Sequence, residues 1–217
     1  MLATDLLGNA SSPVKVLCLG AHSDDIEIGC GGAVLDLIAS GLGLEVVWVV
    51  FSSGAERERE ARASAALFLE KAHRSEVIVK SFRDGFFPYD GAQIKGEFEV
   101  LKRQISPDLI FTHYRHDRHQ DHRTVSDLTW NTWRDHLILE YEIPKYDGDL
   151  GQPSVFVPLD NDACRDKVHY LMEAFQSQRN KHWFEENTFL ALMRLRGMEC
   201  NAPSGYAEAF YCRKLVL

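Results

Sequence analysis

The sequence lacks several features that would assign a chain of this length to a specialised class of protein. Its five cysteines form no C-x-x-C pair and their number is odd, which argues against a disulfide scaffold and favours a reducing compartment. No apolar run approaches the roughly 20 residues that a transmembrane helix needs. The first 13 residues contain no basic region of the kind that opens a signal peptide. We therefore expect a soluble, cytoplasmic protein.

An excess of positive charge is also missing. The formal net charge of −8 argues against general nucleic-acid binding and against docking on anionic lipid, so neither nucleic acid nor membrane is an expected partner. The glycine cluster at residues 29–32 does not contain G-x-G-x-x-G, which excludes the usual dinucleotide fingerprint. By contrast, 45% of the residues are hydrophobic, which is enough for a full core. These observations favour a globular protein that binds a small molecule.

Apolar runs alternate with helix-forming segments along the first 135 residues. We expect strands over residues 14–19, 44–51, 76–80 and 109–112. We expect the intervening helices over residues 33–40, 56–73, 94–105 and 124–135. This alternation predicts an α/β fold, a Rossmann-like, doubly wound and mainly parallel sheet with helices on both faces.

The chain after about residue 136 has a more mixed pattern. Residues 136–143 alternate apolar and polar side chains, which predicts a half-exposed strand. The remaining expected elements are a strand over 155–157, helices over 160–177 and 182–197, and a final strand over 206–216. Residues 1–13 are interpreted as a polar lead-in. We expect a single domain over residues 1–217 with a C-terminal embellishment after about residue 136.

Side chains that bind metals follow two of the predicted strands. His22, Asp24 and Asp25 come directly after the strand at 14–19. Four histidines follow the strand at 109–112 with a spacing of three residues, namely His113, His116, His119 and His122. The two strands are expected to be neighbours at the topological switch point, so the two loops would meet at one cleft. Two imidazoles and a carboxylate suit Zn²⁺ or Fe²⁺. Residues 114–118 are interpreted as facing solvent.

Two motifs carry a resemblance to a known family. Residues 21–32, A-H-S-D-D-I-E-I-G-C-G-G, and residues 116–123, H-D-R-H-Q-D-H-R, resemble the paired motifs of the PIG-L/LmbE-like N-acetyl-sugar deacetylases. The resemblance extends to G-A-E-R-E-R-E-A-R at 54–62, P-D-L-I-F-T-H at 107–113 and Y-A-E-A-F at 206–210, so it covers most of the chain. Ser23 stands where the family often has proline, a difference that affects the substrate subgroup more than the metal site.

The resemblance implies a role for each matching residue. The zinc ligands would be His22, Asp25 and His122, with Fe²⁺ or another divalent metal as an alternative ion. Asp24 would be the general base and His119 would steady the oxyanion. Asp121 is the motif neighbour of His119, and it would either hold His119 or His122 in one tautomer or cap the helix that follows.

Two further residues are candidates for substrate binding. Arg57 matches a basic position of the family and follows a strand-end loop, so it would hold an anionic part of the substrate. The alternative is an exposed helix charge that pairs with a nearby glutamate. Glu27 would hydrogen-bond a substrate hydroxyl, or it would simply lie in the first turn of a helix.

The expected function is removal of the acetyl group from an N-acetylglucosamine-type sugar or sugar conjugate, by attack of a zinc-activated water with Asp24 as base. The first alternative is hydrolysis of an amide in a non-sugar conjugate. A non-haem Fe(II) oxygenase also fits two histidines and a carboxylate, although the parallel-sheet pattern speaks against it. A non-catalytic nucleotide-binding module would need no Asp24. The resemblance also allows a homo-oligomer, and the aglycone of the substrate stays open.

Overall fold

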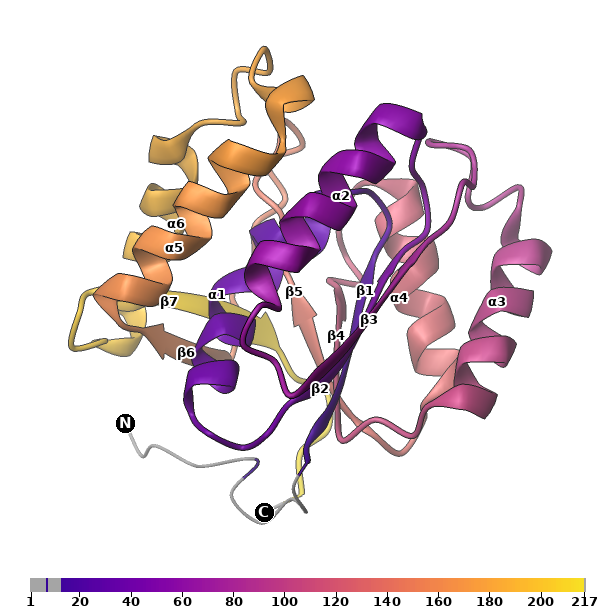
Figure 1. Cartoon of the computed structure of the whole chain (residues 1–217), viewed down its shortest axis with the longest axis horizontal. Coiled ribbons are helices and arrows are strands. Elements are labelled where there is room, and N and C mark those ends of the chain that lie inside the picture. The colour runs from indigo at the N-terminus through magenta and orange to yellow at the C-terminus, as the bar shows by residue number, and fades with distance from the viewer. Residues whose placement is uncertain (1–6, 8–12, 217) are drawn as a thin grey trace.

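A seven-stranded sheet forms the centre of the chain, which a computed structural model describes for residue 7 and for residues 13–216. The strands are β1 (Lys15–Gly20), β2 (Glu45–Val50), β3 (Arg74–Val79), β4 (Leu109–His113), β5 (Leu137–Tyr141), β6 (Val155–Leu159) and β7 (Tyr206–Tyr211). Their order across the sheet is β3-β2-β1-β4-β5-β7-β6 (Figure 1). The neighbours among β1 to β5 pair in parallel, whereas β7 pairs antiparallel with both β5 and β6. The lead-in expected over residues 1–13 lies almost wholly outside the described residues.

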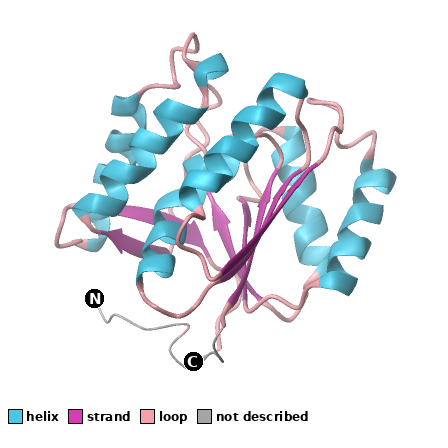
Figure 2. Cartoon of the chain, viewed as in Figure 1, coloured by secondary structure: helices cyan, strands magenta, loops and turns pink. Residues whose placement is uncertain are grey.

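Helices cover both faces of this sheet (Figure 2). They are α1 (Asp25–Ala39), α2 (Ala55–Phe68), α3 (Gly91–Gln104), α4 (Gln120–Thr132), α5 (Asn161–Ala174) and α6 (Glu186–Cys200), with a short 3₁₀ helix η1 (Gln176–Gln178). In Figure 1, α3 and α4 lie on one face, and α1, α2, α5 and α6 lie on the other. The predicted α/β class with a mainly parallel sheet is therefore confirmed. The helix expected over 160–177 is divided into α5 and η1.

The sheet divides the hydrophobic core into two parts, and β1 contributes buried side chains to both. Val16 and Cys18 pack into the cluster beneath α1, α2, α5 and α6. Leu17 and Leu19 pack into the cluster beneath α3 and α4, and all four side chains are fully buried. β1 lies between β2 and β4, as expected for the strand at the switch point. The loops that follow β1 and β4 therefore leave the same edge of the sheet.

The prediction that residues 136–143 form a half-exposed strand was wrong. β5 is an interior strand between β4 and β7, and Glu140 within it is only 1% exposed. Its carboxylate accepts hydrogen bonds from the Arg115 backbone and the Trp130 indole. Two residues later, Glu142 binds Arg196 through both oxygens at 2.7 and 2.8 Å. The polar residues of this alternating pattern are thus satisfied by protein groups rather than by water.

Helix α1 begins at Asp25, eight residues before the predicted start at residue 33. The glycine cluster at residues 29–32 lies inside the helix and allows close packing. A Cβ on Gly29 would lie 2.1 Å from Cδ2 of Tyr141, and one on Gly31 would lie 2.6 Å from Phe68. Close packing of α1 on β5 therefore explains why residue 29 is glycine.

No helix within the described residues is long and apolar enough to cross a membrane.

The packing of α1 on β5 can be tested with one methyl group. Gly29→Ala should destabilise the protein by about 1–3 kcal/mol or more, because the ring of Tyr141 is fully buried and cannot move away. Gly96→Ala is the matched control, because Gly96 lies in α3 and a methyl group added there would meet nothing within 4 Å among the described residues. That change should be neutral or stabilising by up to about 1 kcal/mol. Denaturant unfolding of both variants measures the difference, and equal stability would contradict the packing argument.

Candidate active site

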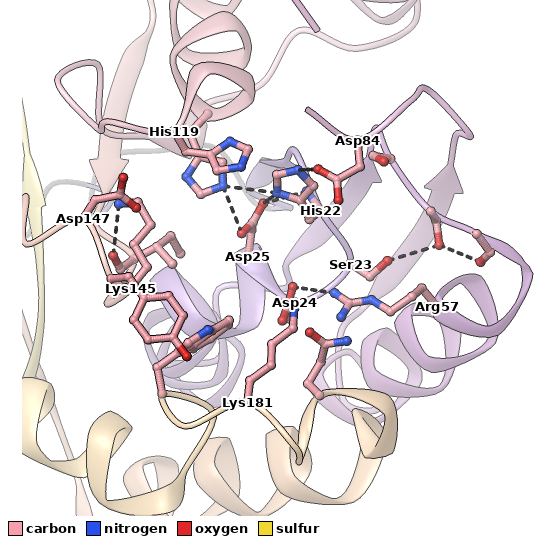
Figure 3. A pocket seen from close by; sticks show the side chains of 18 residues that line it. His22, Ser23, Asp24, Asp25, Arg57, Asp84, His119, Lys145, Asp147 and Lys181 are labelled. Atoms are coloured by element: carbon pink, nitrogen blue, oxygen red, sulfur yellow. Dashed lines mark hydrogen bonds and ion pairs between the residues drawn. The ribbon is translucent and has the colours of Figure 1, made fainter. Parts of the chain in front are cut away.

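The carboxyl ends of β1 and β4 bring two distant parts of the sequence together. The loop after β1 carries His22 and leads directly into Asp24 and Asp25 at the start of α1. The loop after β4 carries His119, and His122 follows in the first turn of α4. Figure 3 shows His22, Asp25 and His119 converging from these elements around one pocket. The expectation that the two loops share one cleft is met.

The three predicted metal ligands lie within contact distance of one another. Nδ1 of His22 is 3.2 Å from Nε2 of His122 and 3.3 Å from Oδ2 of Asp25. Nε2 of His122 is 3.5 Å from Oδ1 of Asp25. Zinc binds nitrogen and oxygen ligands at about 2.0–2.2 Å, so ligand atoms in a tetrahedral arrangement lie about 3.3–3.6 Å apart. The donor types and their spacing therefore fit a divalent ion.

Carboxylates hold the other ring nitrogen of each of these two histidines. Nε2 of His22 lies 3.1 Å from Asp84 and 3.3 Å from Asp121. Nδ1 of His122 lies 2.9 Å from Oδ2 of Asp117. A carboxylate at one nitrogen favours the tautomer whose other nitrogen has a free lone pair, which is the arrangement found around bound metals. Burial lowers the pKa of His122 to about 4, so its ring is neutral near pH 7.

Asp121 therefore has a different partner from the ones that the sequence suggested. Its carboxylate makes a hydrogen bond with His22 rather than with His119 or His122. It also accepts the backbone N–H groups of Gly85 at 2.6 Å and Phe87 at 3.1 Å. These bonds tie the loop after β3 to the site, which is how Asp84 comes to lie on His22. Asp121 does not cap α4, since the N-cap residue is His119.

Asp117 was missed by the sequence analysis, which interpreted residues 114–118 as facing solvent. Its side chain is 2% exposed and binds both His122 and the Lys145 ammonium, the latter at 3.0 Å. Its other oxygen accepts the backbone N–H of His119 at 2.7 Å. The available signal was its position five residues before His122. His116 is exposed, as expected for this loop.

His113 packs against the predicted ligand His122 but does not line the pocket. Its ring is fully buried and stacks on the ring of His122, with centroids 3.9 Å apart. Its Nε2 accepts the backbone N–H of Ala21 at 2.9 Å, so the lone pair of that nitrogen is used. Although Asp25, His113 and His122 also form a compact group, this bond leaves His113 unsuited to bind a second ion. It fixes the plane of the His122 ring instead.

Asp24 and Arg57 form an ion pair, with Nη2 of Arg57 2.7 Å from Oδ1 of Asp24 (Figure 3). Asp24 is 4% exposed, and burial raises the pKa of its carboxyl even though the Arg57 guanidinium lowers it. The sequence suggested that Arg57 holds an anionic substrate or pairs with a nearby glutamate. Its carboxylate partner is the predicted general base.

His119 lies beside the ligand cluster and lines the pocket. Its Nδ1 accepts the backbone N–H of Asp121 at 3.3 Å, so a neutral ring carries its proton on Nε2. Burial and the neighbouring His22 lower the pKa of His119, which favours this neutral form. The ring can therefore donate one hydrogen bond to a group bound in the pocket.

Glu27 does not join the other predicted site residues. Its side chain is fully buried and is not part of the pocket lining. Within the described residues neither carboxylate oxygen has a hydrogen-bond partner, and burial raises the pKa of Glu27 to about 8. Two helical residues turn a side chain by about 200°, so Glu27 points away from the face that carries Asp25. The alternative of a residue in the first turn of a helix is the one observed.

The pocket above these residues has a volume of about 560 Å³. Besides the predicted residues, it is lined by side chains from the C-terminal half of the chain that the sequence analysis did not single out, including Lys145, Gln178, Lys181 and Trp183. These residues come from segments without a recognisable motif.

Comparison with known proteins gives one family and several relatives. The PIG-L family, described as GlcNAc-PI de-N-acetylase, matches residues 17–133. YaiS of Escherichia coli strain K12, named an uncharacterized deacetylase, is 31% identical over an alignment of 153 residues that covers 66% of this chain and 82% of that protein.

Solved structures share the fold. N,N'-diacetylchitobiose deacetylase from Pyrococcus horikoshii superposes with a TM-score of 0.73 at 20% identity, over 96% of this chain and 86% of that one. GalB from Pseudomonas putida KT2440, named a 4-carboxy-2-hydroxymuconate hydratase, has a TM-score of 0.71 at 17% identity, over 94% and 98% of the two chains. Because one of these names describes hydration and the other deacetylation, similarity of fold does not decide the reaction.

Metal binding can be tested within the histidine run itself. His122→Ala should abolish stoichiometric metal binding, because it removes one of the three clustered donor atoms. Asp117→Asn should weaken metal affinity by about 10–100-fold, since it removes the carboxylate that orients the His122 ring. His116→Ala is the matched control and should bind metal like the wild type, because His116 is exposed. Metal analysis with chelator competition measures all three, and undiminished binding by His122→Ala would remove that residue from the ligand set.

Proposed function

The chain belongs to the PIG-L family of deacetylases, and from this premise we propose that it is a metal-dependent hydrolase that removes the acetyl group from an N-acetylglucosamine-type sugar or sugar conjugate. The observation that supports this most directly is the cluster of His22, Asp25 and His122 in one pocket with Asp24 and His119. A metal site, a carboxylate base and a hydrogen-bond donor are the three parts of metal-assisted amide hydrolysis.

His22, Asp25 and His122 would hold the ion, and their two imidazoles and one carboxylate suit Zn²⁺ best, with Fe²⁺ as the next candidate. When bound, such an ion supplies Lewis-acid polarisation of the acetyl carbonyl and lowers the pKa of water. The ring nitrogens that remain on the two histidines are already held by Asp84, Asp117 and Asp121.

Asp24 is the general base of the proposed reaction. It accepts a proton from the water that attacks the acetyl carbon and passes this proton to the leaving nitrogen, so that acetate and a free amine result. The ion pair with Arg57 fixes the carboxylate beside the ligand cluster and keeps it ionised more readily than burial alone would allow. In this proposal Arg57 acts on the base rather than on the substrate.

His119 stabilises the negative charge that develops on the carbonyl oxygen. Its neutral ring donates the Nε2–H, because Nδ1 already accepts the Asp121 backbone N–H. A donor of this kind contributes roughly 3–4 kcal/mol to the stabilisation of the transition state. Asp121 itself acts through His22, whose ring it holds, and is therefore a positioning residue.

The acetamido-sugar substrate rests on the family and its relatives. The family description and the name of the Pyrococcus horikoshii enzyme both refer to N-acetylglucosamine derivatives. A volume of about 560 Å³ lies within the usual range for sites that hold a small molecule. Hydrolysis of a non-sugar amide is the alternative that a substrate panel must separate.

The function is tested by metal content and acetate release. About one metal per chain, with acetate released from at least one member of an N-acetylglucosamine panel, is the expected result. The panel contains the free sugar, its phosphates, its UDP conjugate and N,N'-diacetylchitobiose. Release of acetate only from non-sugar amides would favour the alternative substrate, and release from neither class would overturn the deacetylase.

The base assignment predicts a separation of metal binding from turnover. Asp24→Asn should lower kcat by about 10²–10⁴-fold because amide nitrogen cannot accept the proton, while metal content stays near that of the wild type. Asp36→Asn, near the other end of the same helix, is the matched control and should retain full activity. Steady-state kinetics with metal analysis on the same samples gives the answer. Near-normal turnover by Asp24→Asn would rule out its role as base.

The role of Arg57 predicts a change in pH dependence. The guanidinium lowers the pKa of Asp24, so Arg57→Met should raise that pKa and leave more of the base protonated at a given pH. The acidic limb of the kcat profile should therefore move to higher pH, with activity approached again under alkaline conditions. If Arg57→Met instead raises KM for anionic substrates and leaves the profile in place, Arg57 contacts the substrate.

A further inference from the structure

The segment from residue 175 to residue 184 closes one side of the pocket and is firmly anchored. Its two ends are Phe175 and Phe184, which are almost fully buried and contact each other with ring centroids 6.2 Å apart. Between them, the backbone N–H and the hydroxyl of Ser177 both donate to Glu60 of α2, at 2.8 and 2.6 Å. The backbone of the segment that lines the pocket is thus anchored at both ends and at Ser177.

Gln178 in this segment carries a hydrogen-bond acceptor, Oε1, that no described residue satisfies. The residue is 5% exposed and lines the pocket. Its amide nitrogen donates to the Ser177 hydroxyl at 2.9 Å, but Oε1 has no hydrogen-bond partner in the part of the chain that the structure describes. A buried polar atom without a partner costs free energy. The atom itself is buried, so a small rotation of the Gln178 amide toward the pocket would let a ligand hydroxyl donate to Oε1 and recover this cost.

Lys181 is a cation of the pocket that has no carboxylate partner among the described residues. Two other basic side chains line the pocket, of which Arg57 binds Asp24 and Lys145 binds Asp117 and Asp149. The Lys181 ammonium instead lies near the ring of Trp183, 5.6 Å from Nζ to the centroid. Figure 3 shows its side chain extending from the segment into the pocket, in the direction of Asp24.

Trp183 completes the group. It is half-buried and lines the same pocket, so an apolar ring edge or face stands beside the Lys181 ammonium. Aromatic side chains contribute large apolar contacts, which match the C–H faces of a pyranose ring. An acceptor, a cation and an aromatic surface thus lie together on one anchored segment, which lines the same pocket as Asp24 and His119.

We propose that Gln178, Lys181 and Trp183 form a second subsite, which selects acetamido sugars that carry an anionic group, either a phosphate or a carboxylate. This inference rests on the proposed function, because it assigns the part of the substrate that lies beyond the acetamido group. In a chain with a net charge of −8, an anion needs a local cation to be bound. Lys181 is the cation that remains once the others have been used to hold Asp24 and Asp117.

The test measures binding of reaction products to the metal-loaded full chain, so that no turnover interferes. The probes are glucosamine, glucosamine 1-phosphate, glucosamine 6-phosphate and muramic acid, which separate a neutral sugar from two phosphates and a carboxylate. Calorimetry should show that at least one anionic probe binds the wild type roughly tenfold or more tightly than glucosamine does. The phosphate and carboxylate arms identify the source of the anion.

Three variants decide whether this preference depends on Lys181. Lys181→Met should reduce the preference to within about twofold, and Lys181→Arg should retain most of it because the charge is kept. Lys71→Met removes an exposed lysine that lies outside the pocket, and it should behave like the wild type. No preference for any anionic probe, or a preference that survives Lys181→Met, would overturn the proposal; the second result would show that the anion binds at the metal.

Acetate release from the corresponding N-acetylated sugars separates this inference from the proposed function. Equal kcat/KM for neutral and anionic substrates would overturn the subsite while leaving the deacetylase intact. Acetate release from none of them would instead overturn the deacetylase. A higher kcat/KM for an anionic substrate, lost in Lys181→Met through KM with little change in kcat, would support both.

Discussion

The structure depends most on how the charge of Asp25 is accommodated. The carboxylate is 3% exposed, and an isolated buried charge of this kind would be costly. It stands at the N-terminus of α1, where helix N–H groups favour an anion, and it accepts the backbone N–H of His22 at 2.6 Å. Although burial opposes ionisation, His122, His113 and His22 hold the pKa of Asp25 well below its usual range. The Asp25 carboxylate therefore connects the loop after β1 to the histidine that follows β4. Its oxygens are also the atoms that would bind a metal.

Helix α1 must be held firmly for this arrangement to persist, and the second half of the chain supplies the restraint. The Glu208 carboxylate of β7 accepts the backbone N–H groups of Gly32 and Ala33 at 2.8 and 2.7 Å. Lys167 of α5 binds both Glu208 and the carbonyl of Ile28. Both side chains are buried, so the pair fixes the middle of α1 between two later elements. Tyr141 packs on Gly29 of the same helix and donates its hydroxyl to the carbonyl of Leu19. The antiparallel end of the sheet thereby helps to set the position of Asp25.

Features that neighbouring residues determine could be predicted from the sequence, whereas features that depend on residues far along the chain could not. Apolar runs predict β1 to β4 because burial on both faces is a local property of the run, and neighbouring strand ends then bring His22 and His122 together. The exposure of β5 could not be predicted, since Glu140 and Glu142 are satisfied by partners remote in sequence. The sequence left two roles open for Glu27, and the roughly 100° rotation per helical residue places it in the first turn of α1 but outside the pocket lining. Asp84 lies against His22 because the Asp121 carboxylate binds the backbone of the neighbouring Gly85, in the loop after β3. This contact joins segments that are far apart in the sequence.

The residues proposed for the reaction and those proposed for substrate recognition come from different parts of the chain. The family match ends at residue 133, and it includes every residue that clusters around Asp25. Of the lysine and arginine side chains that line the pocket, Arg57 belongs to this region, and it forms an ion pair with Asp24. The residues proposed to recognise the substrate lie at 178–183, on a segment that no family motif covers and that Glu60 and two phenylalanines fix in place. The family match therefore covers the residues proposed for the reaction and leaves out those proposed for substrate recognition. A change in the 178–183 segment would alter the proposed recognition without disturbing the buried charges around Asp25.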